Sequence, residues 1–165
     1  MASKRSLEEL LAKAVVADYM SVGMITLDSK SSVLDIVKTM SDRNVSSVAI
    51  TENGKIVGIL TERDVVKIVA YEIPPERTNA ASLMVPSLVS IPKNSSLERA
   101  AKLMAQNRVR HLFVEDPTNQ EIIGIVTVTD LARYLKQVLS AHEAKLILLE
   151  VLYPSEEEGE KQFWQ

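Results

Sequence analysis

The sequence predicts an α+β (α/β) fold in which two tandem β–α–β–β–α units pack sheet to sheet as one pseudo-twofold module. Three observations predict it: the chain repeats itself at a nearly constant offset, the two copies differ in length only at a turn, and each copy alternates runs of strand and helix character. We expect an N-terminal helix before the module and an extended C-terminal helix after it. A length of 165 residues suits one compact domain or two small halves.

The repeat is visible in matching residues. Met20 recurs 64 residues later as Met84, and Gly58 recurs 66 residues later as Gly124. The two additional residues of the second copy fall within 116–120, where the first copy has only a short Asn-Gly turn. A loop can lengthen without moving the strands that it joins. The matching residues therefore indicate a structural duplication.

Each copy predicts the same order of elements. The apolar stretches 24–27 and 88–91 predict a first strand, and Ser32 and Ser96 precede segments with apolar residues at helical spacing. Two β-branched runs around Asn53-Gly54 predict a hairpin that leads into a second helix, and the second copy follows the same order. Because one unit is too small to bury both faces of a sheet, we expect the two units to share a single core.

The domain boundaries follow from the repeat and from two prolines after Tyr71, which end the preceding helix. We divide the chain into an N-terminal helix (1–19), a first repeat (20–72), a linker (73–83), a second repeat (84–136), a helical extension (137–153) and an acidic flexible tail (154–165). On the N-terminal helix we expect one buried side made of Leu7, Leu10, Leu11, Ala14 and Val15. The apolar pattern after Asp130 is longer than one unit needs, so it should contact the N-terminal helix or another subunit.

Composition excludes several classes of function. The 19 basic and 22 acidic residues give a net charge of −3, which argues against a nucleic-acid-binding domain. The chain has no cysteine, which excludes disulfides, thiolate metal sites and a thiol nucleophile. Its two histidines, His111 and His142, lack metal-ligand spacing, and no apolar run is long enough to span a membrane. We expect a cytoplasmic protein.

One heptapeptide is repeated where a strand leads into a helix: residues 58–64 and 124–130 both read Gly, two apolar residues, Thr, two further residues and Asp. Threonine followed by an acid three residues later is typical of a capping box, a purely structural role. The same residues suit ligand binding, because a helix start attracts anions and a carboxylate accepts hydrogen bonds from both hydroxyls of a cis-diol such as ribose. The sequence leaves both interpretations open.

Two copies of this motif inside a β–α–β–β–α repeat resemble a tandem pair of CBS domains, named for cystathionine β-synthase. The resemblance covers about residues 16–136. It implies a stand-alone regulatory module with two pseudo-symmetric clefts for adenosine-containing ligands. In each cleft, one unit's Thr and Asp hold the ribose and the other unit's first two strands hold the base and the phosphate.

The resemblance assigns residues to both clefts. The first cleft would use Thr61 and Asp64 for ribose, Ser87, Leu88 and Val89 for the base, and Arg110 and His111 for phosphate. The second would use Thr127 and Asp130 for ribose, Met24, Ile25 and Thr26 for the base, and Val45, Ser46 and Ser47 on the second-strand side.

Ser46 and Ser47 replace the basic pair of the first cleft, and Arg63 is placed to compensate for the missing charge. The alternative is that Arg108, Arg110 and His111 form a solvated strand start and that Arg63 is a surface helix residue.

We therefore expect a non-catalytic energy sensor that binds AMP, ADP or ATP, signals to an unknown effector protein and forms a homodimer. No nucleophile stands near a base, and no glycine-rich loop appears among the five glycines. Three alternatives stay open: a sensor of S-adenosylmethionine, a ligand-free structural or dimerisation module, and, least favoured by the charge balance, nucleic-acid binding. We expect no metal and no catalytic cofactor.

Overall fold

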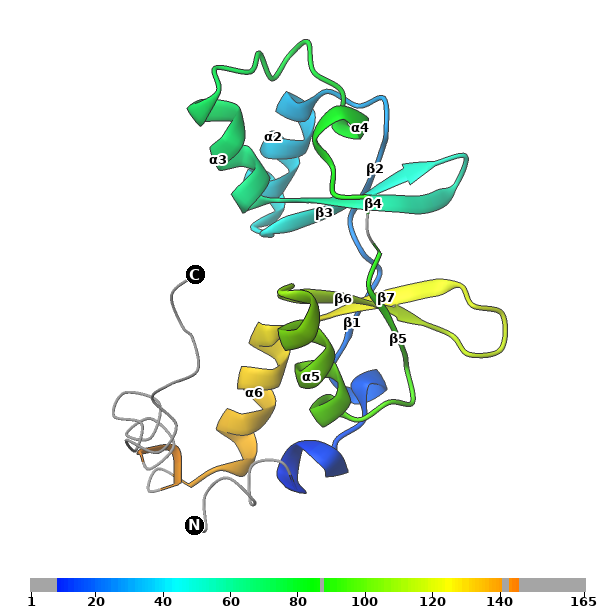
Figure 1. The fold of residues 1–165 in the computed structure, drawn as a ribbon, viewed down its shortest axis with the longest axis vertical. Helices are drawn as coiled ribbons and strands as arrows, with labels where there is room; N and C mark the ends of the chain where they lie inside the picture. Colours follow the sequence, from blue (N-terminus) through cyan, green and yellow to red (C-terminus); the bar gives the residue numbers. More distant parts are fainter. Residues whose placement is uncertain (1–8, 87, 141–142, 146–165) are drawn as a thin grey trace.

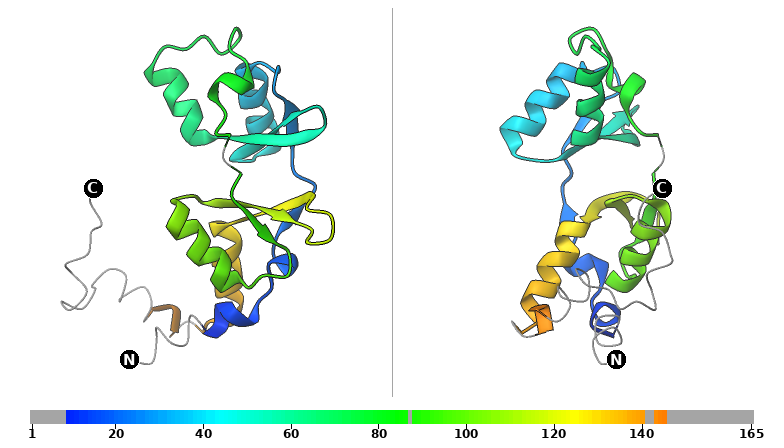
Figure 2. Two further views of the ribbon diagram at one scale, coloured as in Figure 1. Left: turned by 45° about the vertical axis from the view of Figure 1, so that its right-hand side comes forward. Right: turned by 60° about the vertical axis from the view of Figure 1, so that its left-hand side comes forward.

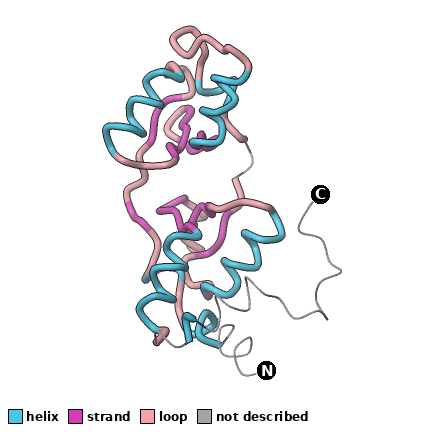
Figure 3. The backbone as a smooth tube through the Cα atoms, turned by 90° about the vertical axis from the view of Figure 1, so that its left-hand side faces the viewer, coloured by secondary structure: helices cyan, strands magenta, loops and turns pink. Residues whose placement is uncertain are grey.

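The computed structural model describes residues 9–86, 88–140 and 143–145, and it confirms two β–α–β–β–α units, each with its own sheet. The units are stacked with their sheets facing each other and their helices on the outer sides (Figures 1 and 3). Each unit is thus a helix layer on a sheet, and the two sheets form the middle of the molecule.

The first unit contains β2 (Thr26–Asp28), α2 (Val33–Arg43), β3 (Ser47–Glu52), β4 (Lys55–Thr61) and α3 (Glu62–Ala70). Its strand order is β2-β3-β4, with β2 parallel and β4 antiparallel to β3. Helix α2 begins where predicted, because the Ser32 hydroxyl accepts a hydrogen bond from the Asp35 N–H at 3.1 Å. The helix ends at Asn44, whose left-handed conformation (φ 51°) turns the chain toward β3.

The second unit repeats this plan with β5 (Ser90–Pro92), α5 (Leu97–Asn107), β6 (His111–Glu115), β7 (Ile122–Thr127) and α6 (Val128–Val138). Its sheet has the order β1-β7-β6-β5. The additional strand, β1 (Ser21–Val22), comes from the beginning of the chain and pairs antiparallel with β7.

The two units exchange their leading residues. Ser21 lies opposite Ile125 in the sheet of the second unit, and Val85, 64 residues later, bridges Ile59 in the sheet of the first. From these positions the chain crosses to the other sheet, and the two connections run on opposite sides of the gap (Figure 2, right, and Figure 3). The strands predicted at 24–27 and 88–91 begin two residues later than expected because the preceding residues make this crossing.

The exchange extends further toward the N-terminus. The Leu97 N–H donates to the carbonyl of Ala14 at 2.9 Å, and in the same way the Val33 N–H donates to Thr78 at 2.9 Å. The 3-10 helix η1 (Val16–Asp18) covers the second unit, and its counterpart α4 (Ala80–Leu83) covers the first. The predicted linker thus includes a packed helix and acts as a cover for the first unit.

The N-terminal segment behaves largely as predicted on the residues described. Residues 9–13 are helical, and Leu11 and Ala14 are buried in the core of the second unit. The Tyr134 hydroxyl of α6 donates to the Leu10 carbonyl at 2.8 Å, which ties the segment to α6. Val15 was expected on the buried side but is 36% exposed, because it forms an edge bridge with Ser96 instead.

The expectation of a single core is wrong, because each sheet has two covered faces. One apolar cluster lies between helices and sheet in each unit, with Ile36 and Leu60 in the first and Leu97 and Leu112 in the second. A third, smaller cluster is centred on Ala49, Ile59 and Phe113, which come from both sheets. Phe113 is only 2% exposed, so this third cluster keeps water from the middle of the interface between the sheets.

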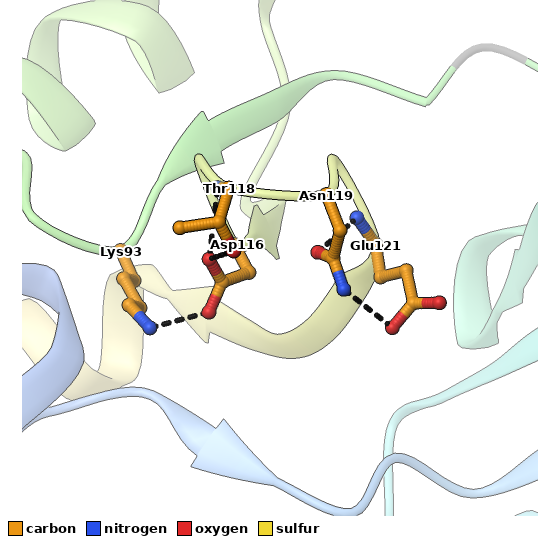
Figure 4. Close-up of polar contacts among 5 residues, drawn as sticks. All are labelled: Lys93, Asp116, Thr118, Asn119 and Glu121. Carbon is orange, nitrogen blue, oxygen red and sulfur yellow. Dashed lines mark hydrogen bonds and ion pairs between the residues drawn. The ribbon is translucent and has the colours of Figure 1, made fainter.

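The tip of the β6–β7 hairpin, where the second copy is longer, is held by its own polar side chains (Figure 4). Asp116 accepts hydrogen bonds from Lys93 and from the Thr118 hydroxyl and N–H. These contacts hold the pKa of Asp116 well below its usual range, Lys93 having the largest effect. Asn119 and Glu121 bond to each other in the same turn, so the longer loop is an ordered tip.

The predicted C-terminal extension is shorter in the part that is described. Helix α6 ends at Val138, and Leu139 is extended (φ −88°, ψ 135°). Residues 143–145 are helical again. His142, most of the extension and the acidic tail with Phe163-Trp164 lie outside the described residues. Within the described ranges, no helix has the length and apolar character needed to cross a bilayer.

The repeated glycines are required by the exchange. A Cβ atom at Gly124 would lie 2.5 Å from the backbone oxygen of Ser21, and one at Gly58 would lie 2.7 Å from the Met84 sulfur and 2.9 Å from the Val85 oxygen. In both units the leading segment of the other unit passes directly over the glycine. Any side chain there would push the segment off the sheet.

We predict that Gly124→Ala lowers the free energy of unfolding by about 1–3 kcal/mol, the usual cost of overpacking. Gly58→Ala should cost less, because its nearest neighbour is the flexible Met84 side chain and its backbone contact, with the Val85 oxygen at 2.9 Å, is longer than the 2.5 Å contact at Gly124. Urea denaturation measures both. Val22→Ala, a change at a 73% exposed residue, is the control and should stay within about 0.5 kcal/mol of the wild type. Equal stability of Gly124→Ala and the wild type would show that the close approach is not restrictive.

Candidate functional site

A cavity of about 220 Å³ lies where the exchanged segments bring the two units together. Its walls come from the end of β4, the first two turns of α3, the crossing segment after Val85, and the start of β6. The lining residues are Ile59, Thr61, Arg63, Asp64, Lys67, Val85, Val89, Arg108, Val109, Arg110, His111 and Phe113. Both units therefore contribute to one site.

Five of the residues predicted for the first cleft meet in this cavity: Thr61, Asp64, Val89, Arg110 and His111. Arg63 was predicted to serve the opposite cleft, and the structure places it on this cavity as well. Leu88 faces a different cavity, described below, and Ser87 lies outside the described residues.

The Asp64 carboxylate is only 3% exposed and is held by three donors. Its Oδ2 atom accepts the Thr61 N–H at 3.0 Å and the Thr61 hydroxyl at 2.8 Å, and its Oδ1 atom accepts the Lys67 ammonium at 2.9 Å. This is a capping box at the start of α3. The structural interpretation of the motif is thus confirmed, and the same carboxylate lies in the wall of the cavity.

The charge state of Asp64 follows from these contacts. Burial by itself would raise the pKa of Asp64, but the hydrogen bonds from Lys67 and from the Thr61 hydroxyl and N–H outweigh it. The pKa therefore lies below its ordinary value, and the carboxylate is charged at neutral pH.

The cavity wall also carries a group of positive charges. Arg63, Arg108 and Arg110 have exposed side chains that form no hydrogen bond or ion pair with any residue in the described part of the chain. Together with Lys67 they place four permanent positive charges around one carboxylate. Unpaired arginines that converge on one cavity favour an anionic ligand with several oxygen atoms.

Arg108 adds a sign of local strain. It is the C-cap of α5 and has a left-handed backbone, with φ 53°. The same position of the first unit carries Asn44, a residue type that tolerates this conformation better. This arginine lies on the wall of the cavity, beside Arg110.

His111 lies between the two predicted clefts. Its backbone pairs with Thr127, the residue that caps α6 and bonds to Asp130. Burial and the neighbouring Arg110 lower the pKa of His111 below its ordinary value of 6.5, and Asp130 opposes them only partly. The imidazole is therefore neutral at pH 7.

The ribose end of the predicted second cleft repeats the geometry of the first. Thr127 donates to Asp130 Oδ2 through its N–H at 2.9 Å and its hydroxyl at 2.8 Å, and Arg133 donates to Oδ1 at 2.9 Å. The phosphate side differs in charge, because Asn44, Ser46 and Thr129 stand where the first cleft has Arg108, Arg110 and Arg63. Ile25, Val45, Ser46 and Ser47 line neither of the two cavities described here.

A second cavity, of about 950 Å³, lies between the two hairpins at the other end of the sheets. Met24 and Thr26, predicted to hold the base in the second cleft, line this cavity together with Leu88. The hairpin tips complete it, with Lys55 on one side and Glu121 on the other. The structure therefore does not bring Met24 and Thr26 together with Asp130 in one cavity.

Sequence reasoning missed several residues of the first cavity. Ile59, Val85, Val109 and Phe113 supply its apolar wall, and Lys67 and Arg108 supply charge. The helical spacing of Lys67, three residues after Asp64, and the substitution of Arg108 for Asn44 between the repeats are signals that pointed to the last two.

Comparison with known proteins matches this architecture to one family. The family model described as CBS domain matches residues 16–71 and 80–137. The CBS domain-containing protein YhcV of Bacillus subtilis is 32% identical over 117 residues, which cover 71% of this chain and 82% of that protein. The chain belongs to the CBS-domain family and forms a tandem CBS pair.

Two solved structures have the same fold. An uncharacterized conserved protein from Pyrococcus horikoshii superposes with a TM-score of 0.69 at 24% identity, covering 79% of this chain and 98% of that one. The CBS domain pair of protein MJ0100, solved with 5'-methylthioadenosine and S-adenosyl-L-methionine, gives 0.67 at 24% identity over 75% of this chain and 97% of that one. CBS pairs are typically regulatory modules that bind adenosyl ligands and are usually non-catalytic, although some relatives are enzymes.

The low pKa of His111 predicts a pH dependence of stability. Its folded pKa lies below the unfolded value, so between the two the unfolded chain binds the proton and the folded chain does not. The resulting stability is complete above about pH 6.5 and is lost as the pH falls through the folded pKa. The melting temperature of His111→Gln should therefore fall less than that of the wild type between about pH 7.5 and about pH 5. Parallel curves for the two proteins would contradict the buried, neutral imidazole.

Proposed function

We propose that this CBS pair is a non-catalytic regulatory module that binds an adenine nucleotide (AMP, ADP or ATP) in the first cavity. The observation that carries the proposal is the meeting of Thr61 and Asp64 from one unit with unpaired Arg108 and Arg110 from the other. A ligand that carries a hydroxylated sugar and, a few bonds away, an anionic group fits this arrangement. The sugar matches Thr61 and Asp64, and the anionic group matches the two arginines. Adenine nucleotides combine both.

Each part of the nucleotide has a matching wall. The ribose hydroxyls would donate to Asp64, the base would lie against Val89 and Phe113, and the phosphates would contact the arginines. The cavity is somewhat smaller than typical ligand pockets of about 300–1,000 Å³. The phosphates would therefore lie at its open side, where the arginine side chains are exposed.

Regulation would follow from the position of the ligand between the units. A nucleotide that contacts α3 of the first unit and β6 of the second stabilises one separation of the two sheets. It shifts the protein toward that arrangement only as far as its affinity for the two arrangements differs. An effector protein that contacts both units would detect the change.

A second candidate ligand is an adenosyl compound without phosphate, such as S-adenosylmethionine or 5'-methylthioadenosine. The neutral residues Asn44, Ser46 and Thr129 of the second cleft support it, since they lack the positive charge that Arg108, Arg110 and Arg63 give the first cleft. The MJ0100 pair was solved with both compounds. We place this ligand class in the second cleft, beside Asp130.

We also propose a homodimer formed through α3. Val66, Val69 and Tyr71 on and just after this helix are 66%, 76% and 75% exposed, although they are large and apolar. Such a group on one helix is typical of a protein contact. Because α3 also begins at the cavity, the contact would connect ligand binding to assembly.

We predict that Asp64→Asn weakens ATP binding roughly tenfold or more, because a charge-assisted hydrogen bond contributes about 1.5–3 kcal/mol and about 1.4 kcal/mol corresponds to a decade. Isothermal titration calorimetry with ATP, ADP, AMP and adenosine measures the effect. Asp130→Asn is the matched control: it removes the same charge from the same kind of cap and should leave the first cavity intact.

Three outcomes decide between the candidates. Loss of nucleotide binding in Asp64→Asn alone supports the first cavity. Loss of S-adenosylmethionine binding in Asp130→Asn alone supports the second ligand class. If the wild-type protein gives no heat of binding and no shift in melting temperature with any adenosyl compound, the pair is a ligand-free structural module. The Thr and Asp residues then serve only as helix caps.

For the dimer, we predict that Val69→Asp shifts the molar mass in light scattering from two chains to one, since a buried charge without a partner opposes association. Val22→Asp, at a 73% exposed residue of β1, is the control and should leave the mass unchanged. A monomeric wild-type protein at micromolar concentration would overturn the proposal.

A further inference from the structure

The Asp64 carboxylate has less free capacity than ribose binding requires. A carboxylate offers about four lone-pair directions, and Thr61 and Lys67 fill three of them. Oδ2 is fully used by the two Thr61 donors, and Oδ1 has one direction left beside Lys67. A cis-diol donates two hydrogen bonds, so one existing donor must leave before both hydroxyls can bind.

Lys67 is the donor that can leave. Thr61 is fixed as the cap of α3, and both of its bonds to Asp64 belong to the capping box. Lys67, in contrast, has a flexible side chain that is 52% exposed, while the carboxylate that it contacts is 4% exposed. Turning Lys67 away costs one ion pair and disturbs no packing in the core.

The released ammonium does not leave the site. Lys67 lines the same cavity as Arg63, Arg108 and Arg110, and among the described residues no carboxylate other than that of Asp64 lines it. A displaced Lys67 therefore leaves its positive charge uncompensated beside three other cations. Only a negative charge on the incoming ligand compensates for the lost contact with Asp64.

We propose that Lys67 makes recognition of the sugar conditional on a phosphate: it occupies Asp64 while the cavity is empty and transfers to the ligand's phosphate when the ribose hydroxyls take its place. This inference rests on the proposed nucleotide function and names the residue that sets its specificity. It predicts that adenosine binds more weakly than ATP, although both ligands offer the same sugar and base contacts. The charge on the phosphate, not its size, is what is selected.

The second unit has a different residue at the position of Lys67. Arg133 stands at the position equivalent to Lys67 and bonds to Asp130 at 2.9 Å. There the phosphate-side positions are neutral, so a displaced Arg133 would meet no cluster of like charges. The conditional step therefore belongs to the first cleft.

The test is Lys67→Met, titrated with ATP and with adenosine by calorimetry. Adenosine should bind about threefold more tightly than to the wild type, because it no longer displaces an ion pair. ATP no longer displaces the ion pair either, but it loses one charge-assisted contact to phosphate worth about thirtyfold, so it should bind about tenfold more weakly. The preference for ATP over adenosine thus falls about thirtyfold, the product of the two changes.

Two controls separate this role from general loss of charge. Lys67→Arg keeps a cation that reaches Asp64, as Arg133 does in the other unit, and should keep the preference for ATP within about twofold. Arg110→Ser, which introduces the residue found at Ser46, should weaken ATP without tightening adenosine. Tighter adenosine binding in Lys67→Met alone is the signature of the proposed displacement.

The proposal is overturned if adenosine binds Lys67→Met no more tightly than the wild type, or if both ligands change by the same factor. These outcomes leave the nucleotide function standing when the wild type still binds ATP. A wild type that binds neither compound removes the nucleotide function itself, and with it the role of Lys67. A melting curve of Lys67→Met confirms that the exposed substitution leaves the fold intact.

Discussion

The exchange of leading segments between the two units is the constraint on which the rest of the structure depends. Each sheet is completed at one edge by residues that belong, in sequence, to the other unit, and each helix layer is covered by the segment that precedes them. The two sheets are thereby held face to face. Neither unit has a complete edge or a complete apolar cover on its own, so each unit depends on the other for part of its packing.

The cavity is a consequence of this exchange. The segment after Val85 has to cross between the sheets, and it lines the cavity with Val89 where it passes the start of α3. The same strand-to-helix turn that needs a capping box for stability thus becomes the wall of a site shared by both units. One carboxylate, Asp64, takes part in both roles, and the positive charges around it come from both copies of the repeat.

The repeat, the hairpins and the caps could be predicted from the sequence because they depend on local patterns such as Ser32 with α2 or Asn53-Gly54 with its hairpin. The exchange of leading segments could not be predicted, because the pairing of Ser21 with Ile125 depends on contacts between residues distant in the chain. Its signal in the sequence is limited to two glycines, Gly58 and Gly124. For the same reason the sequence could not show that Met24 and Thr26 also line the cavity between the hairpins, together with Leu88. The heptapeptide 58–64 lies within one unit, so the proximity of Thr61 and Asp64 could be predicted from it. The part of Lys67 in the site could be seen only from its contact with Asp64 in the structure.

The pairing of β1 with β7 also sets the order in which the protein can be completed during synthesis. Ser21 leaves the ribosome about 100 residues before its partner Ile125, an interval of roughly 5–20 s at about 5–20 residues per second. The first sheet gains its edge from Val85 much earlier. The first unit can therefore complete its sheet while β1 is still unpaired. Strand β1 finds its place only when β7 has been synthesised and pairs with it.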